Sequence, residues 1–432
     1  PNLARTSQTA PEGISAPVVD AGSGREADIA GKRLRDSIVI MDWNSNMEWL
    51  AVPEFGGKAV IFRASPKTGG VLARNKFLAV PANIPRYYVE EKDLPLLDSL
   101  LQSAPPQVTV KCDMAWDRVK TENILARISG GDTPPDNRDP DKAPIVFLAH
   151  YDSISVVPDL SPGAEQACSP AVLLELTRFL LNLPEKPGRP VYVLFTGGHG
   201  QALAGITRFV RRLKDGLDSA WKAEPTGSLV SRMGRPALVV ELDLSSHSDR
   251  FGVFAYGQFR SYHDGNLRPK FASLGLKLAE FVKKQCPRFD PDKDLPGFVD
   301  AINSPQGRGW TTYFPYHTAF ESELANMAGI PGITFATIND DRNLVDTPDD
   351  RVEYLNFDLL NRQLVSEQGK RLGLPTFALG LLFWKGPFVT ENVRTTLARV
   401  RGRTLRLDQE KDYTPNQPLA KAVVFFKTPR GD

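Results

Sequence analysis

Four nearly continuous apolar runs between residues 143 and 340 predict strands that are buried on both faces. They read APIVFLAHYD, PVYVLFTGG, PALVVELDLSS and PGITFATIND. Between them lie stretches with helical spacing of apolar residues, such as PAVLLELTRFLLNL, GITRFVRRLKDGL and RPKFASLGLKLAEFVKKQC. This alternation predicts an α/β domain with a doubly wound, mostly parallel sheet, which binds ligands beyond the carboxyl ends of its strands.

The pattern changes at three points along the chain and predicts four segments. Residues 1–27 are rich in Ala, Ser, Gly and Pro without an apolar period, which predicts an extended tail. Residues 28–117 hold three β-like runs and one helical run, which predicts a smaller mixed α/β unit. The larger α/β domain takes residues 118–385. Residues 386–432 alternate polar and apolar positions and predict a short C-terminal β segment, either by itself or as part of a truncated domain.

Composition limits the classes of function. The chain has 432 residues, 41% hydrophobic and 24% charged, with a net charge of +2, so nothing predicts attraction to nucleic acid. The longest apolar run, PTFALGLLFW, is too short to span a bilayer, so no transmembrane segment is predicted. The three cysteines are far apart and form no CxxC pair, which argues against a disulfide scaffold or a cysteine zinc site.

Ionisable side chains follow the predicted strands at the points where the strands end. His150 closes the first strand and Asp152 follows it, while His199 comes after the Gly-Gly that ends the second. Asp243 closes the third strand, and Asp346 follows the fourth. Parallel strands bring their carboxyl ends to one crevice, and converging His and Asp are typical of a metal site. We expect Asp152 to orient the imidazole of His150.

Each of these residues also has a simpler interpretation. A single His at a strand end is commonly a hydrogen-bonded loop residue. Asp243 could cap the next turn, and DTPDD is a good turn sequence by itself. His247, His263 and His317 are expected to be surface or packing residues. Only the convergence at successive strand ends favours a site.

The order of the motifs resembles the superfamily of co-catalytic di-zinc aminopeptidases. NILARISG, IVFLAHYDS, SPGAEQACSPAVLLEL, VYVLFTGG, ELDLSS, AGIPGITF and DTPDD occur in the order and approximate spacing of that superfamily. It includes bacterial leucyl aminopeptidases, glutamate carboxypeptidase and the non-peptidase relatives transferrin receptor, nicastrin and nicalin. The unit at residues 28–117 resembles the protease-associated domain found with such enzymes. The resemblance implies an extracytoplasmic setting, whether secreted, periplasmic or membrane-associated, and a peptide or protein ligand.

The resemblance also implies a ligand set, of which part is retained. In the superfamily one carboxylate bridges two zinc ions, and a Glu next to a ligand Glu is the general base. The first metal position additionally takes a His and an Asp, which match His150 and Asp243 here. The second takes a Glu and a His.

The remaining positions depart from the superfamily pattern. Gln166 stands at the place of the bridging carboxylate, with Glu165 one residue earlier. His199 stands at the general-base position, and Gly200 replaces the ligand Glu of the second metal position. Asp346 stands where that position takes a His. Fewer carboxylates remain to balance two Zn²⁺ ions in a low-dielectric crevice, so we expect no di-zinc site.

These departures favour a catalytically inactive aminopeptidase-like domain that acts as a binding or scaffolding module. The alternative is a rewired hydrolase with one zinc ion held by residues among His150, His199, Asp243 and Asp346. A third hypothesis is nucleophilic catalysis by Cys168, activated as a thiolate by a nearby His, although a buried structural Cys is the simpler interpretation.

A loop between residues 302 and 320 offers candidates for a ligand cleft. Trp310, Tyr313 and Tyr316 are aromatic side chains suited to a peptide-like ligand. Structural packing explains them equally well.

Overall fold

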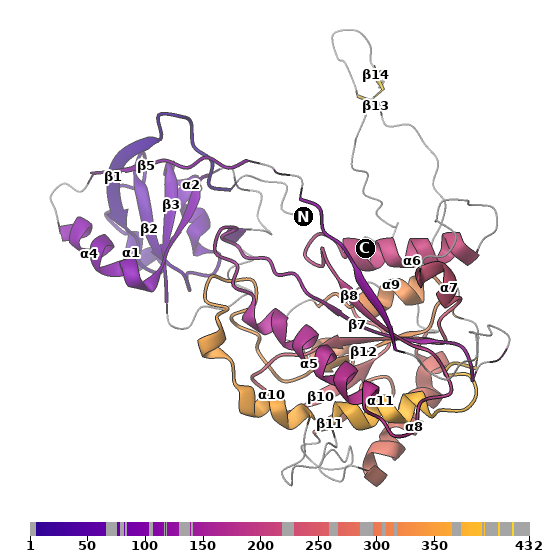
Figure 1. Ribbon diagram of the computed structural model, residues 1–432. Coiled ribbons are helices and arrows are strands. Elements are labelled where there is room, and N and C mark those ends of the chain that lie inside the picture. Colours follow the sequence, from indigo (N-terminus) through magenta and orange to yellow (C-terminus); the bar gives the residue numbers. More distant parts are fainter. Residues whose placement is uncertain are drawn as a thin grey trace.

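The fold was analysed in a computed structural model of the whole chain (Figure 1). The residues that the structure describes are 6–65, 76–77, 82, 84–102, 107–115, 117, 119–128, 139, 141–217, 229–258, 267–285, 297–304, 308–314, 318–364, 373–390, 393, 405–406 and 417–418.

The N-terminal unit is built on a five-stranded sheet in the order β4-β3-β2-β1-β5. Strands β1 to β4 are parallel, and β5 runs antiparallel to β1. The strands are β1 (Ile14–Asp20), β2 (Ile38–Asp42), β3 (Ala59–Arg63), β4 (Arg86–Val89) and β5 (Gln107–Val110). The helices are α1 (Glu26–Ile29), η1 (Glu48–Leu50), α2 (Ala51–Glu54), η2 (Glu91–Asp93) and α4 (Leu94–Gln102).

Strand β1 lies inside residues 1–27, so the prediction of an extended tail was wrong there. Ala16 and Val18 are buried and alternate with more exposed residues along the strand. This is the period of two that a half-buried strand requires. The run is short and contains Pro17, which obscured the pattern. The unit therefore starts earlier than residue 28.

The larger unit contains a seven-stranded sheet in the order β11-β10-β12-β9-β7-β8-β6. Its centre is parallel, while β6 and β10 run antiparallel to β8 and β12. The strands are β6 (Ile124–Ile128), β7 (Ile145–His150), β8 (Val191–Thr196), β9 (Leu238–Asp243), β10 (Phe251–Phe254), β11 (Phe298–Asp300) and β12 (Gly332–Thr337). The four apolar runs correspond to β7, β8, β9 and β12, and the predicted α/β fold is confirmed.

Helices cover both faces of this sheet. Phe147 packs with residues of α5, α8 and α11 on one face, and Leu148 packs with residues of α6 and α9 on the other. This alternation along one strand explains why the central strands are continuously apolar. The helices are α5 (Ala164–Leu181), α6 (Ala204–Leu217), α7 (Leu229–Met233), α8 (Leu267–Gln285), η5 (Trp310–Thr312), α9 (Glu321–Met327), η6 (Val352–Tyr354), α10 (Phe357–Leu364) and α11 (Leu374–Leu382).

The two units meet through loops of the larger one. Val156, in the loop after β7, is buried in a core cluster of the N-terminal unit. The Tyr88 hydroxyl donates to Asp349 at 3.1 Å, and Arg351 pairs with Glu90 at 3.1 Å. The loop that begins beside the predicted site is therefore part of the junction.

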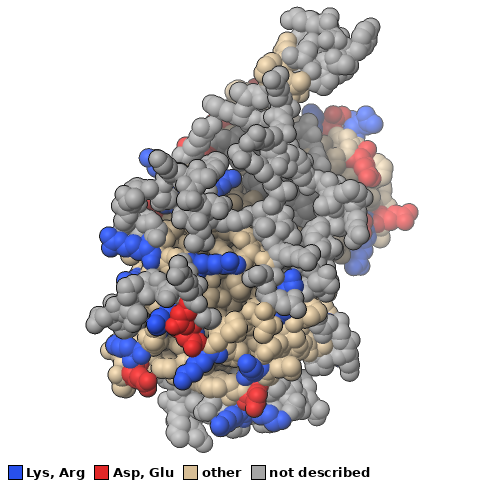
Figure 2. All heavy atoms as spheres, turned by 90° about the vertical axis from the view of Figure 1, so that its right-hand side faces the viewer, with Lys and Arg blue, Asp and Glu red and all other residues tan. Residues whose placement is uncertain are grey.

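Most of the predicted C-terminal β segment lies outside the described residues. Within it the structure describes β13 (Leu405–Arg406) and β14 (Gln417–Pro418), which pair antiparallel. None of the described helices has the length and apolar character needed to cross a bilayer. Among the described residues on the face shown in Figure 2, Lys and Arg are scattered between acidic and other residues.

Candidate functional site

The ends of β7, β8, β9 and β12 lie at one edge of the larger sheet, and the predicted site residues gather there. His150 and Asp243 are the last residues of β7 and β9, and His199 follows β8 after two glycines. Gln166 lies in the first turn of α5, and Asp346 lies beyond β12.

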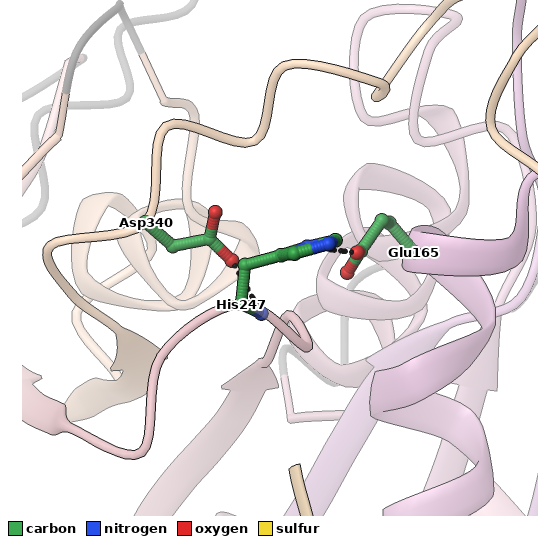
Figure 3. Close-up of side chains that lie close together, drawn as sticks. All are labelled: Glu165, His247 and Asp340. Atoms are coloured by element: carbon green, nitrogen blue, oxygen red, sulfur yellow. Dashed lines mark hydrogen bonds and ion pairs between the residues drawn. The ribbon is translucent and has the colours of Figure 1, made fainter. Parts of the chain in front are cut away.

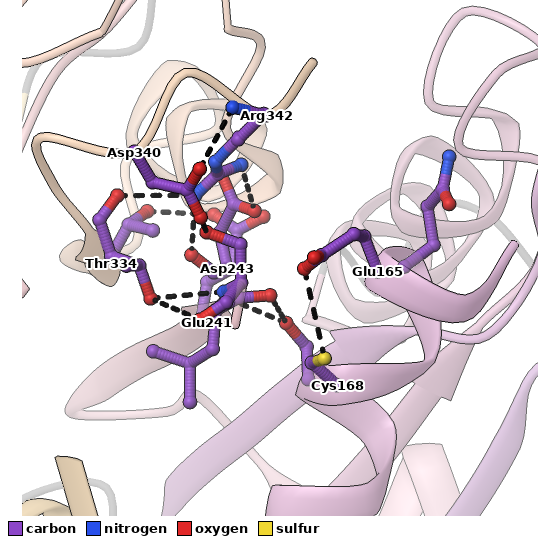
Figure 4. Close-up of polar contacts among 12 residues, drawn as sticks. Glu165, Cys168, Glu241, Asp243, Thr334, Asp340 and Arg342 are labelled. Carbon is purple, nitrogen blue, oxygen red and sulfur yellow. Dashed lines mark hydrogen bonds and ion pairs between the residues drawn. The ribbon is translucent and has the colours of Figure 1, made fainter. Parts of the chain in front are cut away.

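The first metal position contains an arginine. Nη1 of Arg342 donates to Oδ1 of Asp243 at 2.7 Å, and Nη2 donates to the Asp243 carbonyl oxygen at 2.8 Å. Figure 4 shows Arg342 and Asp243 among the polar contacts of this edge. Both residues are buried, and the guanidinium lies 5.4 Å from the centre of the Phe314 ring. The carboxylate that the superfamily uses as a zinc ligand is thus already bound to a cation.

The backbone that carries Arg342 is unusual. Asn339, Arg342 and Asp346 have φ angles of 56°, 46° and 65°, in the left-handed region that non-glycine residues rarely adopt. Asp340 accepts a hydrogen bond from the Arg342 backbone N–H at 2.9 Å, and Nη2 of Arg342 reaches the Thr337 carbonyl oxygen at 3.3 Å. These contacts stabilise the conformation that points the guanidinium at Asp243.

The second metal position is closed by other means. Nε2 of Gln166 donates to Oδ1 of Asp346 at 3.3 Å, so the bridging and final positions bind each other. A Cβ atom added at Gly200 would overlap Cγ2 of Ile154, which comes from the loop after β7. The volume beside residue 200, where a ligand Glu would begin, is filled by an aliphatic side chain.

The two histidines stack against each other. The ring centroids of His150 and His199 are 3.9 Å apart, with 23° between the planes. Nδ1 of His199 lies 3.2 Å from Oε1 of Glu321, whose Oε2 accepts a hydrogen bond from Thr196 at 2.6 Å. Glu321 is fully buried at the start of α9.

Asp152 does not take the expected role. Its Oδ1 accepts a hydrogen bond from the His199 backbone N–H at 3.0 Å. Nδ1 of His150 is buried and has no hydrogen-bond partner among the described residues. The prediction that Asp152 orients His150 was therefore wrong, because the carboxylate turns to the Gly-Gly loop.

Opposite shifts separate the histidine pKa values. Burial disfavours the charge on His199, but the hydrogen bond and charge of Glu321, with Glu241 beyond, raise its pKa to about 9. Burial, followed by the charges of His199 and Arg342, holds the pKa of His150 well below its usual value. At neutral pH His199 is an imidazolium and His150 is neutral, so the residue at the general-base position has no free site for a proton.

Glu241, which sequence reasoning did not single out, binds the N-terminus of α9. It accepts hydrogen bonds from the backbone N–H groups of Glu321 and Ser322 at 2.9 and 3.0 Å and from the Thr334 hydroxyl at 2.6 Å. Burial and the nearby charges of Glu321 and Asp243 raise its pKa to about 8. Its place on a buried strand was the available signal, because a buried Glu needs partners.

A second cluster lies one residue from the bridging position. Single ligand atoms of Glu165, His247 and Asp340 lie within 4.8 Å of one another (Figure 3). Nδ1 of His247 is 2.7 Å from Glu165, and its backbone N–H donates to Asp340 at 3.0 Å. Ser246 and Ser245 donate hydroxyl hydrogen bonds to Glu165 and Asp340 at 2.7 and 2.6 Å. His247, expected to be a surface or packing residue, belongs to this satisfied hydrogen-bond cluster, and Glu165 raises its pKa.

Cys168 is in an unsuitable environment for a nucleophile. It is buried, and its Sγ lies 3.9 Å from a carboxylate oxygen of Glu165. Burial, and then the charge of Glu165, raise the pKa of the thiol. A nucleophilic cysteine needs the opposite shift, so this hypothesis was wrong.

The aromatic cleft candidates are mainly core residues. Trp310 is buried in a cluster with Phe254 and Phe314, and the Tyr313 ring packs edge-on against Phe254 at 5.8 Å. Trp310 and Tyr313 are therefore accounted for by packing. Tyr316 lies outside the described residues.

Comparison with known proteins identifies the larger unit. Residues 123–293 match the sequence profile of Peptidase family M28. Nicalin from Caenorhabditis elegans is 37% identical over 224 residues, which are 51% of this chain and 35% of nicalin. The larger unit therefore contains a region similar to M28 peptidases, and the chain is similar in sequence to nicalin. The match spans about a third of the length of nicalin.

The solved structure of nicastrin shows a similar fold. The gamma-secretase component nicastrin has a TM-score of 0.51 and 11% identity, covering 87% of this chain and 71% of its own. A zinc aminopeptidase from Bacillus subtilis has a TM-score of 0.45 and 15% identity, covering 90% of this chain and 80% of its own. At these identities the likeness concerns the fold.

The residues of this M28-like site do not fit a pair of zinc ions. Asp243 is bound to the guanidinium of Arg342, whose charge would repel a cation at the first metal position. The second metal position offers Asp346, bound to Gln166, and a glycine closed by Ile154. A carboxamide is also a poor bridge, because it offers one neutral oxygen.

Proposed function

We propose that the M28-like domain is catalytically inactive and serves as a peptidase-like scaffold that binds a protein or peptide partner. The observation that carries the proposal is the contact between Gly200 and Ile154. The chemistry of the superfamily needs a glutamate there to hold a metal, and an aliphatic side chain fills that volume instead.

The environment of His199 supports the same proposal. A general base must be unprotonated when it takes the proton of an attacking water. His199 is engaged with Glu321 at 3.2 Å, and this carboxylate, with its neighbours, raises the imidazole pKa to about 9. The side chain is therefore protonated over the pH range in which a base would be needed.

A single-metal hydrolase is less well supported, because three of its four proposed ligands are already bound to other residues. Asp243 binds Arg342, Asp346 binds Gln166, and His199 binds Glu321. A metal would have to break these contacts.

The relatives support partner binding by analogy. Nicastrin is a component of gamma-secretase. For this chain we propose a protein partner and an extracytoplasmic or membrane-associated setting.

An aminopeptidase assay tests the proposal. The chain is assayed on leucine p-nitroanilide and a peptide panel with added Zn²⁺ or Co²⁺, beside a His150→Ala variant and an active zinc aminopeptidase. We expect the chain to match His150→Ala at background. Turnover that is abolished by His150→Ala and by a chelator would contradict the proposal. About one bound metal per chain by elemental analysis would favour the single-metal alternative.

A further inference from the structure

The first metal position keeps the His and the Asp of the superfamily, His150 and Asp243, yet it also holds a fixed positive charge. Asp243 is buried and its carboxylate makes a charge-assisted hydrogen bond with Arg342 at 2.7 Å. A buried carboxylate without a cation is costly, so a chain that loses the metal needs another partner for it. The guanidinium meets that need.

We propose that the guanidinium of Arg342 replaces the cation of the first metal position and joins β9 to the segment after β12 without a metal. This inference rests on the proposed loss of the di-zinc site. It goes beyond inactivity, because it assigns to one residue the structural work that a metal does in an active relative.

The directions of the Arg342 contacts support this replacement. A metal ion at this position would join side chains from several strand ends. Arg342 likewise binds both the side chain and the carbonyl oxygen of Asp243 on β9, and it reaches the Thr337 carbonyl oxygen at the end of β12. Its planar fork of donors can serve these acceptors together, which a lysine cannot do.

The strained backbone is a further argument. Arg342 has a φ of 46°, and its N–H is held by the Asp340 carboxylate at 2.9 Å. A non-glycine residue keeps such a conformation only where surrounding contacts require it. An arginine on the surface could reach a carboxylate from an ordinary backbone conformation and would not need this one.

Thermal unfolding with and without Zn²⁺ tests the proposal. In the wild-type chain we expect Zn²⁺ or EDTA to shift Tm by less than about 1 °C, because Arg342 occupies the first metal position and the Glu165, His247 and Asp340 cluster is hydrogen-bonded within itself. Arg342→Met should lower Tm by roughly 10 °C, because it leaves Asp243 buried and unpaired. Added Zn²⁺ should then raise the Tm of Arg342→Met by about 3 °C or more.

Two variants serve as controls. Arg189→Met removes another buried arginine, which donates to the Trp384 carbonyl oxygen at 2.7 Å, and it should lose stability without gaining a response to Zn²⁺. The double variant Arg342→Met/Asp243→Asn buries no charge, so it should be more stable than Arg342→Met and should not respond to Zn²⁺.

Several results would overturn the replacement. One is an Arg342→Met chain with the Tm of wild type. Another is an equal shift of Tm by Zn²⁺ in the wild-type and Arg342→Met chains. A third is an Arg342→Met chain with a lowered Tm that Zn²⁺ does not raise. If Arg342→Met does not fold, Arg342→Lys and the wild-type chain decide: a wild-type Tm lowered by EDTA, or an Arg342→Lys chain as stable as wild type, would refute it. An inactive wild type stabilised by Zn²⁺ would refute this inference alone, leaving the proposed function in place.

Discussion

The two metal positions of the M28-like unit have departed from the superfamily in different ways. The first keeps its ligands, His150 and Asp243, and gains a cation from the protein, Arg342. At the second, Asp346 binds a carboxamide and Ile154 fills the volume beside Gly200. In the proposed inactive domain, the first position is neutralised by a guanidinium and the second is occupied by neutral side chains around one remaining carboxylate.

The difference has an energetic consequence. A buried ion pair leaves an uncompensated charge when one partner is removed, which costs several kcal/mol. A long amide–carboxylate hydrogen bond and an aliphatic contact cost much less to lose. Stability should therefore be sensitive to substitution at the first metal position and tolerant at the second.

The largest effect is expected for Asp243→Ala. It leaves the Arg342 guanidinium buried without its carboxylate, so the free energy of unfolding should fall by about 3–5 kcal/mol. Urea unfolding measures this, with Asp98→Ala on the exposed face of α4 as the control with no effect. A loss below about 1 kcal/mol would mean that the Asp243–Arg342 pair is not the main ionic contact of this edge.

An intermediate effect is expected from pH. The native pKa of His199, about 9, lies above the ordinary value of 6.5, so its stabilisation is complete below pH 6.5 and is lost as pH rises through 9. The native pKa of Glu241, about 8, is also raised, so its ionisation lowers stability as pH rises from 4.5 to 8. Urea unfolding between pH 6.5 and 9 should therefore show a loss of at least about 2 kcal/mol.

His199→Gln checks the assignment of this pH dependence. The variant lacks the titrating imidazole, so its stability should fall less steeply over the same range. A wild-type stability that is flat or rises towards pH 9 would contradict the pKa directions.

The smallest effect is expected for Gly200→Ala at the second metal position. The new Cβ meets Ile154, which is only partly buried and can shift, so the cost should be about 1 kcal/mol. The double variant Gly200→Ala/Ile154→Ala should recover part of that loss relative to the sum of the single variants. Additive effects in this cycle would show that the contact does not close the position.

Much of the fold could be predicted from the sequence because its determinants are local. The central strands are continuous apolar runs, and a residue such as His150 is placed by the end of its own strand. Convergence of His150, Asp243 and His199 then follows from parallel topology. Strand β1 could have been found from its alternation, had Pro17 not interrupted the pattern.

The contacts within the site could not be predicted in the same way. Arg342 and Asp243 are 99 residues apart, and the hydrogen bond between Glu165 and Ser246 spans 81 residues. No local period encodes such a pair. The available hint was physical: a retained Asp243 without its metal needs a cation, and NDDRNLVDTPDD offers one.

The contact between Ile154 and Gly200 has a consequence for the history of such a chain. A reversion to glutamate at residue 200 would meet the isoleucine and bury a charge before any metal could compensate it. Loss of Arg342 alone would likewise leave the buried carboxylate of Asp243 without a positively charged partner. If the metal site was lost as proposed, each single substitution back towards the superfamily ligands would lower the folding stability before a metal could bind. The loss of the site would therefore be difficult to reverse by one substitution at a time.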